Sequence, residues 1–325
     1  MGLRKTFGRR RVLWVGAAIT VLVGVVAITI AFTGAVRAAQ SRISGNSVVI
    51  VGHAGRLEFA SAGHGPPLLM IHGTGGGFDQ GLLFSRAISA RGIRIIAPSR
   101  FGYLRSDFPP DPSSERQADA FVELLDRLKL RRVAVAGGSA GALSAVQFAL
   151  RHPDRTSALI LIVPAANVEG QDPNAMSPLQ EWIVRRLVTS DFAYWAARTA
   201  APGTITGFLL ATDPALLDTV SDGERQRAKA ILDAILPISA RSRGMLNDAK
   251  LAGHPARIDF RDLRVPLLIV SADDDRFGSA TTARFIARQV PTAKLVIYPT
   301  GGHIFLGHDA DAAQEIAAFV ARHAR

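Results

Sequence analysis

The sequence predicts an α/β fold: a mostly parallel central sheet flanked by helices, with an inserted helical cap and an N-terminal transmembrane helix. Three observations support this. Short apolar runs of strand length alternate with helical patterns, the region from about 167 to 264 lacks a convincing buried strand, and residues 12–36 carry no charge. With 325 residues, 48% of them hydrophobic, the chain can bury a large core.

The N-terminal segment has the features of a signal anchor. Val12 to Val36 is rich in Val, Ile, Ala and Leu, and as a helix it would extend about 37 Å, against about 30 Å of bilayer hydrocarbon. Arg9-Arg10-Arg11 precedes it directly. The positive-inside rule therefore predicts a cytoplasmic tail over 1–11 and a single-pass membrane protein, whose linker (37–47) and large C-terminal domain (48–325) are extracytoplasmic.

Two other interpretations of this segment stay open. Val36-Arg37-Ala38 resembles a small-residue cleavage site, so the chain could be exported after signal cleavage, although the apolar run exceeds the usual length of about 7–15 residues. The paired arginines also suggest a Tat-type signal, but the rest of that motif matches poorly. A buried core helix is disfavoured, because the segment has no polar face.

Charge and composition exclude several function classes. Seven of the basic residues that give the net charge of +11 lie before residue 43, where there is no acidic residue, so the remainder carries only +4. No interleaving of basic and aromatic residues is found, and we expect no nucleic-acid partner. There is no cysteine, hence no thiol nucleophile or disulfide. No set of metal ligands is visible, and we expect no cofactor. The oligomeric state is not indicated.

Eight segments are predicted as strands. The first two, separated by the turn His53-Ala54-Gly55, form a hairpin, and several of the others are apolar throughout, as strands buried on both faces should be. The predicted strands are 48–51, 56–60, 67–71, 94–98, 131–136, 158–163, 265–270 and 294–298. Between them the predicted helices include one with Phe121, Leu124, Leu125 and Leu128 on a single face, and the last begins near Asp311.

The predicted cap (about 167–264) has helical segments such as 181–188 and 228–236, separated by Pro and Gly. Most of its aromatic residues lie close together in sequence, at Trp182, Phe192, Tyr194, Trp195 and Phe208. Trp182 and Trp195 are therefore candidates for an apolar lid over a substrate pocket. The alternative is that they simply pack the cap onto the core.

Ser139 is the candidate nucleophile. It lies in Gly137-Gly138-Ser139-Ala140-Gly141, between a predicted strand and a predicted helix, and matches the G-x-S-x-G pattern. The sharp turn forces the serine into strained backbone geometry, and glycines flank it because larger side chains would clash with the crossing strand and helix. The alternative is an ordinary glycine-rich turn.

A second glycine-rich loop, His72 to Gly77, follows the strand 67–71. We predict that the backbone N–H groups of Thr74 and Ala140 form an oxyanion hole, with Gly73 beside the substrate. His72 is interpreted as structural, its ring bonded to nearby backbone. A phosphate-binding loop is the alternative, but neither nucleotide-binding fingerprint fits.

Taken together, these motifs resemble the α/β-hydrolases, from about Val48 to the C-terminus. The resemblance rests on the His72-Gly73 loop, the Ser139 motif, the Asp274 turn and Gly302-His303, in that order. It implies the fold and a catalytic triad of Ser139, an acid and His303. His308 is the alternative base.

The acid of the triad is ambiguous. In the family it usually follows a small residue at the strand end by three positions, and counting from Ser271 gives Asp274. Asp275 and Asp273 are the alternatives, and Glu169 or Asp172 would serve if the acid came after the preceding strand. The turn carries a serine rather than an aspartate at position 139, so dehalogenase and epoxide-hydrolase chemistry is disfavoured.

The function that follows is a serine hydrolase acting through an acyl-enzyme on Ser139. The aromatic cap and membrane segment favour a carboxylesterase or lipase-like activity on a small apolar ester at the membrane. Amide, lactone and carbon–carbon bond hydrolysis would use the same residues. The alternative from another class is a non-catalytic hydrolase-fold protein that binds a ligand or a partner.

Overall fold

The computed structural model describes residues 3–168 and 178–324, and its central feature is an eight-stranded sheet of order β1-β2-β4-β3-β5-β6-β7-β8. β1 and β2 are antiparallel to their neighbours, and all other pairs are parallel. The predicted α/β architecture is confirmed. The strands are β1 (Val48–Gly52), β2 (Gly55–Ala62), β3 (Pro67–Ile71), β4 (Arg94–Pro98), β5 (Val133–Gly138), β6 (Thr156–Ile162), β7 (Leu267–Ala272) and β8 (Lys294–Tyr298).

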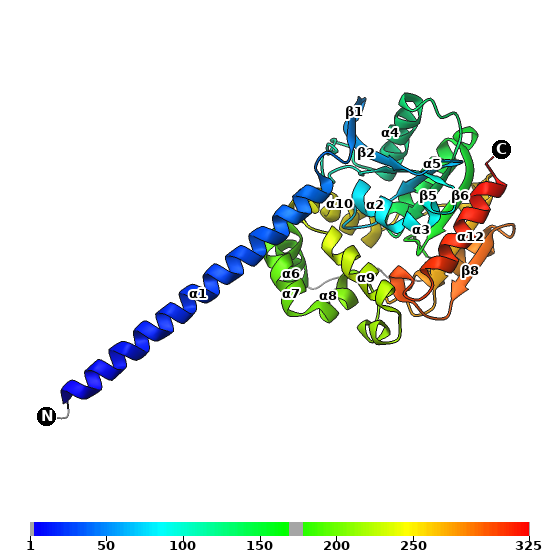
Figure 1. The fold of residues 1–325 in the computed structure, drawn as a ribbon. Helices are drawn as coiled ribbons and strands as arrows, with labels where there is room; N and C mark the ends of the chain where they lie inside the picture. The colour runs from blue at the N-terminus through cyan, green and yellow to red at the C-terminus, as the bar shows by residue number, and fades with distance from the viewer. Residues whose placement is uncertain (1–2, 169–177, 325) are drawn as a thin grey trace.

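Helices cover both faces of the sheet (Figure 1). In β5, for example, Val133 and Val135 pack into one apolar cluster and Ala134 and Ala136 into another, which is why the strands are apolar throughout. The first face is covered by α4 (Ser114–Arg127), α5 (Gly141–Arg151) and α11 (Ser279–Gln289). The second is covered by α2 (Phe78–Phe84), α3 (Arg86–Ser89) and α12 (Asp309–Arg322).

The described residues between β6 and β7 form helices and turns, as predicted for the cap. The five helices are α6 (Pro178–Thr189), α7 (Asp191–Ala200), α8 (Pro202–Leu209), α9 (Asp222–Ala234) and α10 (Ser242–Gly253). They share a separate apolar cluster that includes Tyr194, Ile231 and Leu232. This cluster also takes in Ala39, from the N-terminal helix.

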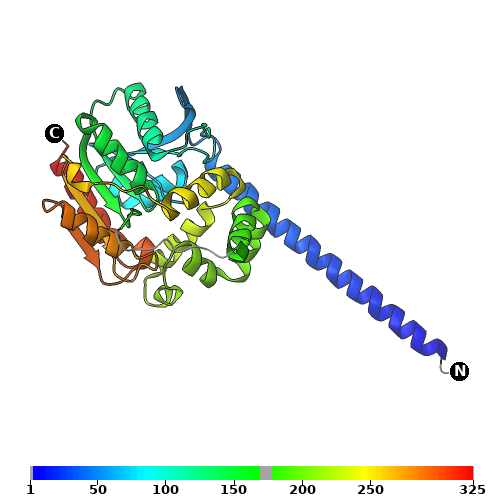
Figure 2. The same ribbon diagram turned by 180° about the vertical axis from the view of Figure 1, so that it is seen from behind.

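The N-terminal helix α1 (Leu3–Ile43) projects from the rest of the protein as a single rod (Figures 1 and 2). Its segment Trp14–Ile43 has the length and the apolar composition of a membrane-spanning helix or of a signal sequence. The prediction of a linker over 37–47 is wrong for residues 37–43, which are helical. No helix-breaking residue occurs between Val36 and Gly45, and Ala39 is buried against the cap.

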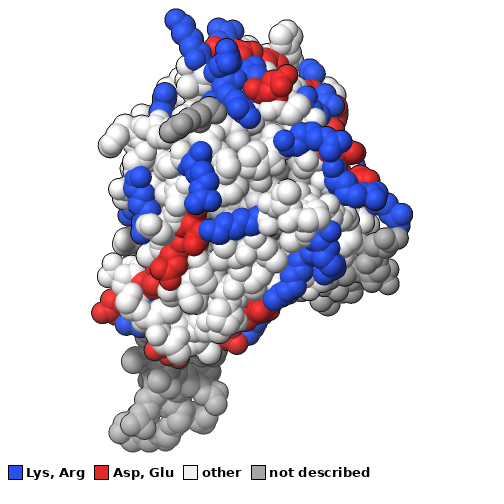
Figure 3. Space-filling view, turned by 90° about the vertical axis from the view of Figure 1, so that its right-hand side faces the viewer, with Lys and Arg blue, Asp and Glu red and all other residues white. Residues whose placement is uncertain are grey.

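Charged side chains are dispersed over the face of the molecule shown in Figure 3, where Lys and Arg alternate with Asp, Glu and uncharged residues. Several of the cations of the folded part have acidic partners, such as Lys294 with Glu315 and Arg284 with Asp273. The positive charge of the folded part is therefore spread and partly paired.

Candidate active site

Ser139 stands at the turn between β5 and α5, and its backbone φ is +52°. This left-handed conformation is unfavourable for a residue with a side chain and is found at functional turns. A Cβ added at Gly141 would lie 2.5 Å from the carbonyl oxygen of His72, and one at Gly137 would lie 2.8 Å from the Cα of Ala142. The predicted reason for the flanking glycines is confirmed: strand, turn and helix approach too closely for side chains.

We expect Gly141→Ala to destabilise the protein by about 1–3 kcal/mol, because the colliding atoms are backbone and cannot rotate away. Gly138→Ala is the matched control, since a Cβ at Gly138 meets no atom within 4 Å. Urea unfolding of the two purified variants measures the difference. Equal stabilities would contradict this account of the turn.

The candidate catalytic residues follow different strands but lie at one edge of the sheet. Ser139 follows β5, the Asp273–Asp275 turn follows β7, and His303 follows β8. Because these strands are parallel, their carboxyl ends share this edge. Backbone hydrogen bonds connect the strand ends: Ser139 N–H to Ile162 O (2.9 Å), Val163 N–H to Val270 O (2.8 Å) and Asp273 N–H to Tyr298 O (2.9 Å).

The imidazole of His303 is paired with Asp275, whose Oδ2 lies 2.7 Å from Nδ1. The His303 backbone N–H donates to Thr212 Oγ1 (3.0 Å), and the Phe277 ring packs edge-on against the imidazole, with 5.1 Å between centroids. Since a carboxylate only accepts, Nδ1 carries the proton and Nε2 is left as the basic atom.

The Asp275 side chain is fully buried. Burial raises its pKa, but hydrogen bonds from His303, the Ser279 hydroxyl and the Phe277 N–H outweigh this and hold the pKa below its usual value. Asp275 therefore remains a carboxylate at neutral pH. Thr212, Phe277 and Ser279 were not singled out from the sequence, because their positions depend on how the cap and the turn after β7 fold.

The prediction that Asp274 faces the histidine is wrong. Its carboxylate instead accepts the backbone N–H groups of Gly302 (2.7 Å) and Gly301 (3.1 Å), and so holds the loop that carries His303. Asp273 is half exposed and pairs with Arg284. Counting three positions from Ser271 ends one residue before the partner of His303, because the turn after β7 directs the side chain of Asp275, not that of Asp274, toward the imidazole.

The remaining candidates for the base and the acid lie away from this pair. His308 stacks on the Tyr298 ring at 4.6 Å between centroids, and its Nε2 lies 3.5 Å from Thr300 Oγ1. It is thus engaged away from Asp275. Glu169 and Asp172 lie outside the described residues.

The loop after β3 lies against the serine. A Cβ at Gly73 would lie 3.0 Å from both Ser139 Cβ and the Gly138 carbonyl oxygen, so a side chain there would push against the serine turn. The N–H groups of Thr74 and Ala140 donate no hydrogen bond to any acceptor among the described residues. An oxyanion hole requires amides without an internal partner, and the role of these two stays a prediction.

A buried polar cluster that no sequence motif indicated holds this loop. Asp248, from the cap helix α10, accepts hydrogen bonds from the Thr74 hydroxyl (3.0 Å), from Arg100 Nη1 (2.7 Å) and from the Tyr103 hydroxyl. Arg100 is 6% exposed and pairs with Asp248. No local pattern links residues so far apart in the chain, so the sequence carried no signal for the cluster.

His72 is structural, as predicted. Its Nδ1–H donates to the Gly73 carbonyl (2.7 Å), and its Nε2 accepts the N–H of Arg100 (3.0 Å). Burial and the Arg100 charge lower the pKa of His72 well below its usual value of 6.5. The ring is therefore neutral in the folded protein.

Because the unfolded chain protonates this histidine below about pH 6.5 and the folded chain does not, His72 should make stability fall as the pH falls below that value. The expected slope is about 1.4 kcal/mol per pH unit for this one group. We expect His72→Gln, whose amide can replace both hydrogen bonds, to reduce the slope. Urea unfolding at a series of pH values tests this, and an unchanged slope would contradict it.

The two cap tryptophans have partners outside this edge. Trp195 packs on Phe32 of α1, with 5.6 Å between ring centroids, and Trp182 is 56% exposed, with the Arg186 guanidinium 5.5 Å from its ring centroid. Their role as pocket walls stays a prediction.

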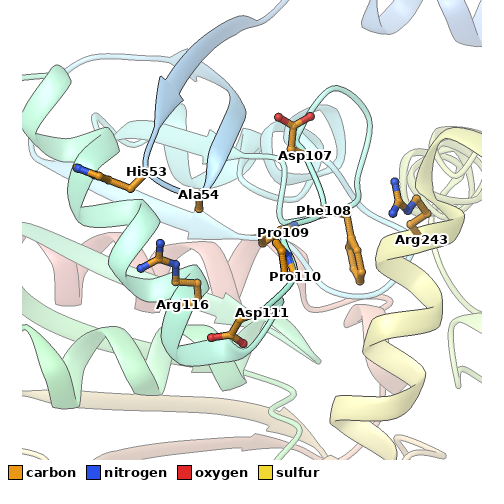
Figure 4. Close-up of a pocket in the computed structure, with 9 residues that line it drawn as sticks. All are labelled: His53, Ala54, Asp107, Phe108, Pro109, Pro110, Asp111, Arg116 and Arg243. Carbon is orange, nitrogen blue, oxygen red and sulfur yellow. The ribbon is translucent and has the colours of Figure 1, made fainter.

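A cavity of about 600 Å³ lies elsewhere, where the β1–β2 hairpin tip meets the loop before α4 (Figure 4). His53 comes from the hairpin, Arg116 from α4 and Arg243 from α10, whose guanidinium lies 5.0 Å from the ring centroid of Phe108. None of the candidate catalytic residues lines it. It is therefore separate from the serine.

Comparisons with known proteins agree with this arrangement. The model of the alpha/beta hydrolase fold family matches residues 66–309. An uncharacterised hydrolase of Bacillus subtilis, YcgS, is 26% identical over 277 residues, covering 79% of this chain and 91% of the relative. The pimeloyl-[acyl-carrier protein] methyl ester esterase of Aromatoleum aromaticum is 28% identical over 262 residues, covering 76% of this chain and 95% of the relative.

Among solved structures, a bacterial membrane phospholipase A superposes with a TM-score of 0.60 at 20% identity, covering 97% of this chain and 98% of its own. Since α1 has 41 of the 325 residues, a match over 97% of the chain includes most of this helix. The likeness in fold therefore extends to the N-terminal helix. The family model matches most of the chain, and the structure places a serine at the β5–α5 turn and a histidine–carboxylate pair at the same sheet edge. The chain is therefore a hydrolase of the α/β-hydrolase family.

Proposed function

We propose that this protein is a membrane-anchored serine hydrolase that cleaves carboxylic esters with an apolar acid or alcohol. The observation that carries the proposal is the pairing of His303 with Asp275, at the sheet edge where Ser139 holds its strained backbone conformation. A non-catalytic binding protein would have no need of this strain or of a buried, ionised partner for the imidazole.

In the proposed reaction, Nε2 of His303 takes the proton of the Ser139 hydroxyl as the oxygen attacks the ester carbonyl. Asp275 orients the ring through Nδ1–H and stabilises the imidazolium that forms. The N–H groups of Thr74 and Ala140 bind the developing oxyanion. His303 then protonates the departing alcohol, and a water activated by the same ring releases the acyl group from Ser139.

The preference for an apolar ester has two supports. One relative that covers most of this chain is named for an ester substrate, and the cap above the sheet has an apolar core. Amide, lactone and carbon–carbon bond hydrolysis would require the same three side chains.

Membrane anchoring is the second part of the proposal, with the N-terminus cytoplasmic and the catalytic domain extracytoplasmic. Phe32, Ala35 and Ala39 pack against the cap cluster, and cleavage at Val36-Arg37-Ala38 would remove the first two of them. A retained anchor is consistent with this packing. Protease treatment of intact cells that left the catalytic domain protected would contradict the orientation.

The test of the hydrolase is a screen of p-nitrophenyl esters of increasing acyl chain length, with amide and lactone substrates in parallel, using the full chain in detergent. We expect ester turnover, with kcat/KM rising as the acyl chain lengthens. The same preparation should react covalently with a fluorophosphonate probe. Failure of both reactions would favour the non-catalytic alternative.

A further inference from the structure

The anchor helix is docked onto the cap along one face. Phe32, Ala35 and Ala39 lie at helical spacing and pack into the cap cluster. The Phe32 ring contacts Phe192 and Trp195 of α7, with centroids 5.3 and 5.6 Å apart. Figures 1 and 2 both show α6 and α7 beside this end of α1.

Ionic contacts fix the end of the same helix. Arg42 Nε lies 3.3 Å from Oδ2 of Asp79, and its Nη2 donates to the carbonyls of Ala234 and Leu236. Asp79 also pairs with the fully buried Arg241, at 2.9 Å. The helix is thus held at Phe32 by aromatic packing and at Arg42 by ionic contacts, two points about 15 Å apart along its axis. These two contacts fix the direction of α1 relative to the cap.

The undocked part of α1 has the length of a bilayer core. Val12 to Ala31 is 20 residues, which as a helix extends about 30 Å, equal to the hydrocarbon thickness. Arg9, Arg10 and Arg11 precede it. A helix inserted over this length reaches the membrane surface at Phe32, the residue at which α1 first contacts the cap.

The cap carries exposed aromatic and basic side chains on α6 and α7, the two helices beside this end of α1. Trp182 of α6 is 56% exposed and Phe192 of α7 is 49% exposed. Arg185 and Arg186 are basic neighbours on α6, and the Arg186 guanidinium lies over the Trp182 ring. Tryptophan concentrates at membrane interfaces, and arginine beside it suits anionic headgroups. We call Trp182, Arg185, Arg186 and Phe192 the cap patch.

We propose that the cap patch rests on the bilayer surface, with its aromatic rings at headgroup level, so that the cap is a second membrane contact besides α1. The occupant is a lipid surface containing anionic lipid. Two observations favour a lipid surface over a second copy of the chain. The patch adjoins the docked helix through the contact of Phe192 with Phe32, and the undocked part of α1 is as long as the bilayer core is thick. The inference rests on the membrane anchoring proposed above, but not on the hydrolase chemistry.

The test uses the fluorescence of Trp182 alone. The chain has three tryptophans, so Trp14→Phe with Trp195→Phe leaves this one, in the full chain reconstituted into phosphatidylcholine–phosphatidylglycerol vesicles. We expect its emission to shift to shorter wavelength on reconstitution and to be quenched by lipids brominated near the headgroup. The control replaces all three tryptophans by Phe and adds Leu295→Trp, on β8, whose emission should not be quenched.

Flotation of the vesicles separates the two proposals. Protein that floats with the vesicles but whose Trp182 is not quenched would overturn the cap contact and leave the anchoring intact. Protein that does not float would overturn both, while ester turnover in detergent would still report on the hydrolase. Trp182 shielded from both brominated lipid and aqueous acrylamide would indicate a second copy of the chain and overturn the lipid contact. Arg185→Gln with Arg186→Gln should abolish the difference in Trp182 quenching between vesicles with and without phosphatidylglycerol, without changing turnover of a short soluble ester.

Discussion

Ser139→Ala is expected to lower kcat for a p-nitrophenyl ester by about 10⁴-fold or more, because removing a nucleophilic serine leaves only the contribution of the oxyanion hole and substrate binding. The change removes one oxygen atom and should leave the fold intact. Turnover at saturating substrate and fluorophosphonate labelling of the purified full chain measure the effect.

The matched control for this variant is Ser144→Ala, which changes a buried serine further along α5. It should keep both turnover and labelling. If the Ser139→Ala protein were still labelled, the nucleophile would have to be another residue, and the assignment of this sheet edge as the active site would fail.

Asp275→Asn should cost about 10⁴-fold in kcat, because an amide at this position no longer selects the His303 tautomer with a basic Nε2. Asp274→Asn should cost much less. Its Oδ1 can still accept one of the two loop N–H groups, so we expect a loss of about 1 kcal/mol of stability, the usual size of one hydrogen bond.

The comparison needs kcat and urea unfolding for both variants, so that a folding defect is not read as a catalytic one. A larger loss of kcat in Asp274→Asn than in Asp275→Asn, at equal stability, would show that the partner of His303 during turnover differs from the one described here.

The fold could be predicted because its signals are local. An apolar run such as 67–71 and the helical spacing of Phe121, Leu124 and Leu125 report burial on each element directly. The serine turn could also be predicted from the sequence, since the close approach of the backbone requires Gly137 and Gly141 on either side of the serine. These features depend on residues adjacent in sequence.

The choice among three consecutive aspartates could not be predicted in this way. Which carboxylate faces the imidazole depends on the turn after β7, where Gly278 adopts a φ of +71° and the Ser279 hydroxyl reaches back to Asp275. The only local clue to the role of Asp274 was the pair of glycines before His303, whose amides need an acceptor. The end of α1 could not be predicted for a related reason: residues 37–43 are mostly polar, and the burial of Ala39 that keeps them helical depends on the distant cap.

The docking of α1 also decides where the gene should be cut to obtain a water-soluble enzyme. Starting at Ala31 would delete the portion proposed to span the membrane while retaining Phe32 against Trp195 and Arg42 against Asp79. Starting at Ser44 would expose the apolar side of α7 that Phe32 covers, and we expect aggregation during purification. It would also remove Arg42, one of the two arginines paired with the buried Asp79. The stretch from Ala31 to Ile43, which looks like dispensable leader sequence, is thus part of the folded enzyme.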